Sequence, residues 1–203
     1  MAIALSRRGA PAQQRSRERL ERILAVASAL IAEEGSDHMR MSEVAERAGI
    51  SIGSLYQYFP DKGAIIRALA GRYHVASRAC IETALAGVRD LPGLCAAFAG
   101  LVDQYYALFL AEPVMRDIWS GMQADKRLVA TELAESRANG AMLADAMARV
   151  HPGADREKLA TSAFLIWQLG EAAMRLAISV KRAEGDAVVD AYKRMTLREL
   201  AQA

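Results

Sequence analysis

The sequence predicts an all-α protein in which a small amino-terminal unit of three helices precedes a larger helical domain. Apolar residues recur at helical spacing along most of the 203 residues, and no stretch shows the strict alternation that is typical of a strand. Gly and Pro breaks divide the chain into segments of helical length. A hydrophobic content of 53% is ample for a core, so we expect the chain to fold.

The first predicted helix covers residues 15–34 and ends at Gly35, a residue typical of the position after a helix. The fourteen residues before it are expected to be disordered. Its apolar positions at helical spacing are Leu20, Ile23, Leu24, Ala27, Leu30 and Ile31.

Residues 41–59 predict two very short helices with a turn at Gly49 between them. Ser42 and Ser51 are expected to cap these helices, and Pro60 follows the second one. Helices this short are stable only when packed on neighbours, and the arrangement is that of a helix-turn-helix, which points to DNA. The apolar positions at helical spacing are Val44, Ala45 and Ala48 before the turn, and Ile52, Leu55 and Phe59 after it.

The second short helix is expected to bury Leu55 and Phe59 and to present small and hydrogen-bonding residues to a major groove. Phenol hydroxyls suit phosphate oxygens, and Gly53 lets the backbone come close. Ile52 is a candidate contact for a thymine methyl group and Gln57 for adenine, and each good base contact discriminates by ~1–3 kcal/mol. Short helix pairs with a glycine turn also occur in proteins that do not bind nucleic acid, so the spacing alone leaves that alternative open.

The stretch MSEVAERAGISIGSLYQYFPDK at residues 41–62 resembles the amino-terminal domain of the TetR family of bacterial transcription repressors. The resemblance covers about residues 20–70 and implies DNA binding. It implies phosphate contacts from Ser42, Tyr56, Tyr58 and Lys62, and base-edge contacts from Ser51, Ile52, Gly53, Ser54 and Gln57. The arginines before Leu20 are a second candidate DNA contact, with a solvated charged tail as the alternative.

A long helix over residues 62–88, capped by Asp61, is expected to connect the small unit to the rest of the chain. Breaks near residues 91–93, 113, 121–125 and 151–153 predict further helices at about 93–111, 114–122, 125–149, 155–182 and 185–201.

One helix-turn-helix per chain predicts a homodimer, because two recognition helices ~34–36 Å apart match half-sites on one face of DNA. The best dimer surface lies within residues 155–201, where one helix is apolar on more than one face. Gly170 with Ala173 would allow close helix approach, and the resemblance places the dimer seam on the last two helices. Burial within one chain is the alternative for these residues, which are Phe164, Leu165, Gln168, Leu169, Ala172, Ala173 and Leu176.

Aromatic and methionine residues in the middle of the chain could line a pocket for a small, apolar effector ligand. The same residues could instead form a packed core, and the resemblance favours the pocket because such repressors commonly release DNA when a ligand enters this region. The candidates are Tyr105, Tyr106, Phe109, Met115, Trp119, Met122, Met142, Leu143, Met147 and Trp167. Glu171 either pairs with Arg175 on the surface or turns inward to meet the ligand, and Asp103 and Gln104 are similar candidates.

Composition and charge limit the other possibilities. Residues 1–72 carry eleven basic and eight acidic residues, whereas the remainder has a net charge of −1, so only the amino-terminal part has a general attraction for nucleic acid. Cys80 and Cys95 have no partner at metal-ligand spacing and are expected to be reduced core thiols. No uncharged run reaches the ~20 residues of a membrane span, and we expect a cytoplasmic protein that does not bind a membrane.

We expect neither a cofactor nor a metal, and we do not expect the protein to be an enzyme. The string Gly49-Ile50-Ser51-Ile52-Gly53 matches a nucleophile elbow, but that chemistry requires a preceding strand and a histidine base. His38, His74 and His151 are scattered and lack metal-ligand spacing.

The sequence thus predicts a ligand-responsive repressor that binds a palindromic operator in double-stranded DNA as a homodimer. Residues 1–60 would bind DNA, and residues 61–203 would sense the ligand and dimerise. The alternatives are a helical protein that binds small molecules and a constitutive DNA binder without an effector.

Overall fold

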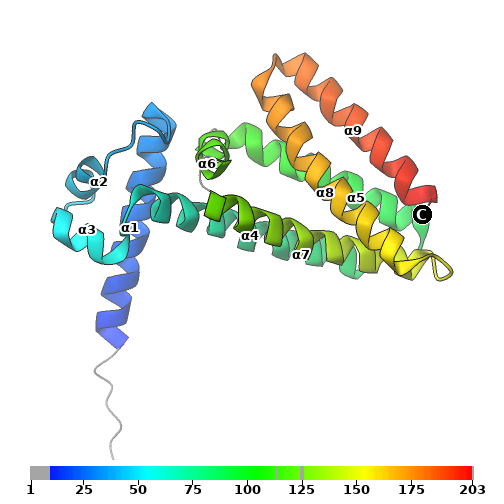
Figure 1. Ribbon diagram of the computed structural model, residues 1–203, viewed down its shortest axis with the longest axis horizontal. Helices are drawn as coiled ribbons and strands as arrows, with labels where there is room; N and C mark the ends of the chain where they lie inside the picture. The colour runs from blue at the N-terminus through cyan, green and yellow to red at the C-terminus, as the bar shows by residue number, and fades with distance from the viewer. Residues whose placement is uncertain (1–9, 113, 124–125, 203) are drawn as a thin grey trace, which may run out of the picture.

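The computed structural model describes residues 10–112, 114–123 and 126–202, and the side chains of residues 13–112, 114–118 and 129–202. Every regular element in this part of the chain is an α-helix, as the sequence predicted (Figure 1). The helices are α1 (Ala10–Glu34), α2 (Met41–Arg47), α3 (Ile52–Tyr58), α4 (Lys62–Ala86), α5 (Leu91–Ala111), α6 (Val114–Gln123), α7 (Lys126–Val150), α8 (Arg156–Ser179) and α9 (Arg182–Gln202).

Helices α1, α2 and α3 form a small unit at one end of the molecule. Its core contains Ile23 and Leu30 from α1, Val44 from α2 and Leu55 from α3, all fully buried. Gly35 and Gly49 have φ angles of 84° and 66°, a conformation that glycine adopts without strain, and they turn the chain after α1 and α2. The two short helices are therefore held by the packing of α2 on α1 and of α3 on α2.

Helix α1 begins earlier than predicted. Residues 10–14 were expected to be disordered but are helical, and the Gln14 side chain donates a hydrogen bond to Glu18 at 3.1 Å. Good helix formers such as Ala and Gln extend the helix here, and proline is tolerated in a first turn. The rest of the segment expected to be disordered, residues 1–9, lies outside the described residues.

Two of the three predicted helix caps are confirmed. The Ser51 hydroxyl accepts a hydrogen bond from the Ser54 amide at 3.1 Å, and the Asp61 carboxylate accepts one from the Ala64 amide at 2.7 Å. The prediction for Ser42 is wrong, because α2 already begins at Met41 and Arg40 occupies the capping position without a side-chain bond. Met41 packs against the core, and the helix therefore begins at this residue, one position before Ser42.

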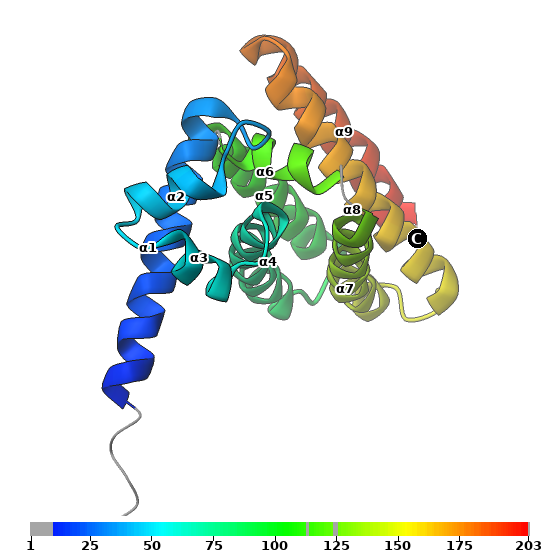
Figure 2. The same ribbon diagram turned by 60° about the vertical axis from the view of Figure 1, so that its left-hand side comes forward.

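Helices α4 to α9 form the larger part, and α4 runs from the small unit into it (Figures 1 and 2). Helix α4 contacts α1 as well as α5, α6 and α7, while α6 also contacts α1. Helices α8 and α9 lie side by side as an antiparallel pair along one edge of the molecule in both views. The two parts are therefore joined through α4 and through the contact of α6 with α1.

The turn between α8 and α9 differs from the prediction, because α8 ends at Ser179 and α9 begins at Arg182 rather than at 185. Gly185 lies inside α9, where a Cβ atom would collide with the main chain of Ala177. The glycine therefore serves the close packing of two helices and does not break one.

Helix α5 is the one described helix that is long and apolar enough to cross a membrane by length and composition, a finding that the search for uncharged runs missed. It has a single charged residue, Asp103, among its 21 residues. Core helices pass the same test, and α5 packs against α4, α7, α8 and α9. Its apolar character is explained by this position at the centre of the larger part.

Candidate functional site

The outer face of α3, together with the start of α2 and of α4, presents the side chains that the sequence singled out for DNA. Leu55 and Phe59 point into the core, as predicted. The predicted contact residues that are exposed are Ser42, Ser51, Ile52, Gly53, Tyr56, Gln57 and Lys62, with 51% of Tyr56 accessible. A short helix with one apolar face buried and the other face small and polar fits a groove.

Tyr58, one of the predicted phosphate contacts, is less exposed than Tyr56. Its side chain is half-buried against the core, and its hydroxyl lies 3.2 Å from the Ser16 hydroxyl of α1. Ser54 is also half-buried, and its hydroxyl accepts a hydrogen bond from Ser51 at 3.0 Å. The Lys62 ammonium group donates to the main-chain oxygen of Asp37 at 3.1 Å. The contact between the Tyr58 and Ser16 hydroxyls therefore positions α3 on α1, a role that side-chain spacing could not reveal.

The first half of α1, which contacts α3 through Ser16 and Tyr58, carries more basic than acidic residues. Arg15, Arg17, Arg19 and Arg22 are exposed along the first half of α1. Arg47 is different, because it pairs with Glu33 at 2.7 Å and with Glu43 at 2.8 Å. The α1 arginines add long-range attraction for an anionic backbone, whereas Arg47 fixes α2 to α1.

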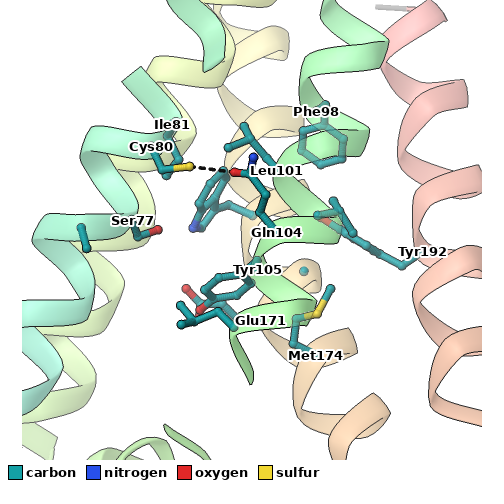
Figure 3. Close-up of a pocket in the computed structure, with 15 residues that line it drawn as sticks. Ser77, Cys80, Ile81, Phe98, Leu101, Gln104, Tyr105, Glu171, Met174 and Tyr192 are labelled. Atoms are coloured by element: carbon teal, nitrogen blue, oxygen red, sulfur yellow. Dashed lines mark hydrogen bonds between the residues drawn. The ribbon is translucent and has the colours of Figure 1, made fainter. Parts of the chain in front are cut away.

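A second candidate site is an apolar cavity of about 170 Å³ in the larger part, between α4, α5, α8 and α9 (Figure 3). Its walls include Ser77, Cys80 and Ile81 of α4, Phe98, Leu101, Gln104 and Tyr105 of α5, Trp167, Gly170, Glu171 and Met174 of α8, and Tyr192 of α9. Apolar and aromatic walls with a few polar groups are typical of pockets for small organic ligands. This region of the chain therefore contains both a cavity and a packed core.

Glu171 is the charged side chain among the residues that line this cavity, and Figure 3 shows it beside Tyr105. The Ser136 hydroxyl of α7 donates a hydrogen bond to the Glu171 carboxylate at 2.8 Å. Burial raises the pKa of Glu171 from 4.5 to about 7, and the nearby Glu132 carboxylate raises it too, while the Ser136 bond and Arg175 oppose the shift. Burial also raises the pKa of the Tyr105 hydroxyl.

Both parts of the chain match models of known families. Residues 23–69 match the model described as bacterial regulatory proteins of the TetR family, and residues 92–203 match the model described as the tetracyclin repressor-like carboxy-terminal domain. The second match alone covers more than half of the chain.

The chain belongs to the TetR family. This TetR-family chain is therefore a DNA-binding transcriptional regulator, and the exposed face of α3 lies in its DNA-binding domain. The family description is that of a regulator and not of an enzyme. TetR-family repressors are soluble DNA-binding proteins, in agreement with α5 being a core helix.

Relatives support the same family. The chain is 39% identical over 70 residues to the HTH-type transcriptional repressor KstR of Mycobacterium tuberculosis, and the match covers 34% of this chain and 30% of the repressor. The chain thus matches less than a third of that relative's length.

Solved structures show the same fold over nearly the whole chain. The SmeT–triclosan complex superposes with a TM-score of 0.69 at 19% identity, covering 90% of this chain and 91% of SmeT. A TetR-family transcriptional regulator from Streptomyces coelicolor gives a TM-score of 0.68 at 22% identity, covering 91% and 98% of the two chains.

The regulator's cavity contains only part of the predicted ligand set. Tyr105, Trp167 and Glu171 line it. Met115, Leu143 and Met147 are fully buried elsewhere in the core, and Met142 packs against that core. Tyr106 and Phe109 line a different hollow, beside Ala177 and Arg182. The side chains of Trp119 and Met122 lie outside the described residues.

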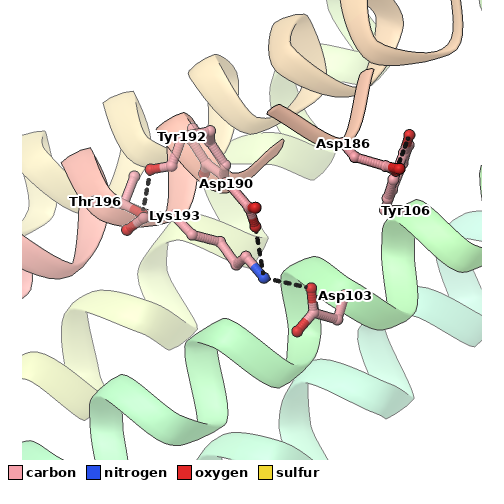
Figure 4. Close-up of polar contacts among 7 residues, drawn as sticks. All are labelled: Asp103, Tyr106, Asp186, Asp190, Tyr192, Lys193 and Thr196. Carbon is pink, nitrogen blue, oxygen red and sulfur yellow. Dashed lines mark hydrogen bonds and ion pairs between the residues drawn. The ribbon is translucent and has the colours of Figure 1, made fainter. Parts of the chain in front are cut away.

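The α5–α9 contact explains why two of the candidate ligand residues, Tyr106 and Asp103, lie outside this cavity (Figure 4). The Tyr106 hydroxyl donates to the Asp186 carboxylate at 3.0 Å, and Asp103 pairs with Lys193 at 2.7 Å. Both side chains point toward α9 and away from the cavity, whereas Gln104 lines it. A one-residue step on a helix turns a side chain by about 100°, so composition alone could not separate these neighbours.

Sequence reasoning missed the contributions of α4 and α9 to the cavity. Both cysteines are free, but Cys80 is exposed and its thiol donates to Gln104 Oε1 at 2.9 Å, so the prediction of a core thiol is wrong for it. The Tyr192 hydroxyl donates to the main-chain oxygen of Ile166 at 2.7 Å, which places its ring against the cavity. The packing of four helices brings these residues together, and no local pattern in the sequence signals it.

Four of the seven predicted dimer residues are exposed on the outer side of α8. The inner side of the helix, with Ile166 and Met174, is buried. Leu165, Leu169 and Leu176 are 54%, 44% and 52% exposed and recur at helical spacing with exposed Ala172. Phe164, Gln168 and Ala173 are half-buried. Gly170 lies against the Tyr192 hydroxyl of the same chain, so its close helix approach is to α9 and not to a second copy.

Proposed function

We propose that this regulator binds an operator with two half-sites as a homodimer and releases it when a small, largely apolar ligand enters the α4–α5–α8–α9 cavity. The observation that supports the DNA part best is the exposed face of α3 within a matched DNA-binding domain. Residues 1–60 would bind DNA and residues 61–203 would dimerise and bind the ligand. Repression of transcription in the cytoplasm is the expected outcome.

Individual contacts follow from the chemistry of the exposed side chains. Ser42, Tyr56 and Lys62 would bind phosphates, as would Tyr58 through a hydroxyl that is shared with Ser16. A second group would approach base edges in the major groove, and its members are Ser51, Ile52, Gly53, Ser54 and Gln57.

Dimerisation would use the exposed stripe of leucines on α8. Three exposed leucines on one helical face form an apolar surface that a soluble chain normally covers. A second copy packed on the same face would produce the two-fold symmetry that a palindromic operator mirrors.

Coupling between the cavity and DNA would pass through α4. This helix contributes Ser77, Cys80 and Ile81 to the cavity, and its first residue, Lys62, stands just after α3. A ligand that binds one position of α4 better than another would change the separation of the two α3 helices in the dimer. The free energy by which the ligand shifts the equilibrium between the two positions equals the difference between its binding free energies for them.

Selection of random double-stranded DNA by the purified protein tests the proposal. We expect the selected fragments to share an inverted repeat with half-site centres one helical turn apart, bound at least 1,000-fold more tightly than scrambled DNA. Equal affinity for selected and scrambled duplexes at the same salt concentration would contradict the proposal.

A ligand titration tests the coupling separately. Hydrophobic small molecules, with triclosan among them, are first screened for an increase in melting temperature. A compound that stabilises the protein is expected to weaken operator binding by tenfold or more. Unchanged operator affinity at saturation with such a compound would identify a constitutive DNA binder instead.

A further inference from the structure

We propose that the cavity of this regulator selects an apolar ligand that carries a protonated amine, and that Glu171 together with Glu132 binds the cation. The inference deepens the proposed function, because it names the chemical class of the ligand. It is based on Glu171, the charged residue that lines a largely apolar cavity, and on the buried carboxylate of Glu132, which interacts with Glu171 from outside the lining.

The pair is formed by side chains from two helices. Glu171 of α8 lines the cavity and accepts the hydrogen bond of Ser136 from α7. Glu132 lies one helical turn before Ser136, is only 8% exposed, and its carboxylate is close enough to raise the pKa of Glu171. The Oε1 atom of Glu132 is buried and has no hydrogen-bond partner among the described residues. A buried acceptor without a donor costs free energy, and a ligand that donates hydrogen bonds removes that cost.

The charges around the pair favour a cation. Besides the two carboxylates, the groups that act on this spot are the hydroxyl of Tyr105 from α5 and the guanidinium of Arg175 from α8. The imidazole of His74 from α4 interacts with Glu132, but burial lowers its pKa from 6.5, so it carries no charge at pH 8. One positive charge faces two ionisable carboxyls, so the site is neutral only while the pair holds a proton. An ammonium group can replace that proton and leave the site neutral. A ligand carboxylate would add a third acid to the same spot and is disfavoured.

The remaining walls fit the body of such a ligand. Tyr105, Trp167 and Tyr192 present aromatic rings to the cavity, and aromatic faces attract cations as well as apolar groups. Leu101 and Met174 add aliphatic and thioether surface. An amine on an aryl-alkyl body would therefore place its charge at Glu171 and its apolar part among these side chains.

Three compounds with one apolar skeleton test the inference: 4-phenylbutylamine, 4-phenylbutanol and 4-phenylbutyric acid. Isothermal titration calorimetry at pH 8 is expected to show the amine binding at least tenfold more tightly than the alcohol, and the acid binding most weakly. Lowering the pH to 5.5 is expected to weaken amine binding at least fivefold, because a proton then competes for the pair, and to leave alcohol binding unchanged. Equal affinities of amine and alcohol, or an amine dissociation constant above about 1 mM, would overturn the inference.

Two variants separate the role of the carboxylate from that of the fold. Glu171→Gln is expected to abolish the preference for the amine while it keeps the affinity for the alcohol, which also shows that the cavity is intact. Glu157→Gln removes an exposed carboxylate from the same helix and is expected to retain the full preference. A Glu171→Gln protein that still prefers the amine would overturn the inference.

The outcome is independent of DNA binding. Preference for the amine in a protein that shows no operator would contradict the proposed function and support this assignment. Operator binding without any preference for the amine would support the proposed function and overturn this assignment.

Discussion

Tyr56 and Gln57 are adjacent residues on the exposed face of α3, yet their side chains are suited to different parts of DNA. A phenol hydroxyl is a single donor or acceptor that fits a phosphate oxygen, whereas a carboxamide can form the paired hydrogen bonds that distinguish adenine. Contacts to phosphate contribute affinity on any sequence, and contacts to bases contribute discrimination. Substitution of Tyr56 should therefore change the affinity for any DNA, whereas substitution of Gln57 should change the discrimination between sequences.

We predict that Tyr56→Phe weakens binding to operator and scrambled DNA by the same factor, because only a phosphate contact is lost. Gln57→Ala is expected to lower the preference for one base pair by ~1–3 kcal/mol while it leaves non-specific binding unchanged. Fluorescence anisotropy on operator, single-site variants and scrambled duplex, all at one salt concentration, measures both effects. Equal losses on every duplex for both variants would contradict this division.

Glu171 should make the stability of the protein depend on pH. Its pKa is 4.5 in an exposed chain and about 7 when folded, so between these values the folded protein binds the extra proton and stability falls as the pH rises. We predict that Glu171→Gln removes this loss and is more stable than the wild type by about 1–2 kcal/mol at pH 8. Thermal melts should show a gain that is nearly constant above about pH 7 and shrinks between pH 7 and pH 4.5.

The control is Glu157→Gln, whose carboxylate is exposed on the same helix. Because Glu157 lies in the first turn of α8, where a carboxylate interacts with the helix dipole, its loss should lower the melting temperature slightly, by the same amount at pH 6 and pH 8. A gain for Glu171→Gln that is the same at pH 4.5 and pH 8 would show that the effect does not come from ionisation.

At the residue scale, the sequence could predict positions that local chemistry decides. Ser51 and Asp61 cap helices as predicted because their side-chain oxygens accept from main-chain amides three residues later, a purely local contact. The same reasoning was wrong for Ser42, because α2 begins before it. Glu171 left two alternatives open, a surface pair with Arg175 or a contact with the ligand, and the structure places its carboxylate at the cavity, where Ser136 of α7 donates a hydrogen bond to it. Side chains on a distant helix decided this outcome, so periodicity within α8 could not.

Helices are the level at which the sequence was most informative, because amphipathic periodicity and Gly or Pro breaks are local signals. Most predicted boundaries fall within a few residues of the observed ones. Gly185 caused the start of α9 to be predicted too late, because a glycine that ends a helix and one that allows a neighbouring helix to pack closely cannot be distinguished in sequence. The packing of α9 against Ala177 distinguishes the two cases.

We predict that Gly185→Ala destabilises the protein by about 1–3 kcal/mol, because a methyl group would force α8 and α9 apart. Gly100→Ala in α5 is the matched control, since a Cβ atom there meets nothing within 4 Å. It should instead stabilise the helix by roughly 0.5–1 kcal/mol. Urea unfolding of the two variants measures the opposite signs, and destabilisation by both would contradict the packing explanation.

At the scale of the whole molecule, the cavity and its connection to α3 could not be predicted residue by residue. Four helices from separate parts of the chain surround the cavity, and α4 alone among them continues to the DNA-binding unit. Tyr105 and Trp167 were predicted because aromatic residues are rare and conspicuous in the sequence. Cys80 and Tyr192 were missed because their role depends on how α4 and α9 pack.

The exposed leucines of α8 give the prediction that concerns the whole assembly. In a two-fold symmetric dimer each substitution occurs twice at the interface, so Leu165→Glu would bring two new carboxylates into an apolar contact. We predict that this variant sediments as a monomer at concentrations where the wild type is a dimer, and that it binds a full operator no better than a half-site. Val75→Glu, which replaces an exposed apolar residue on α4, should remain dimeric. A dimeric Leu165→Glu protein would show that the two copies meet on another face, because two buried like charges without partners cost more than an interface of this kind can absorb.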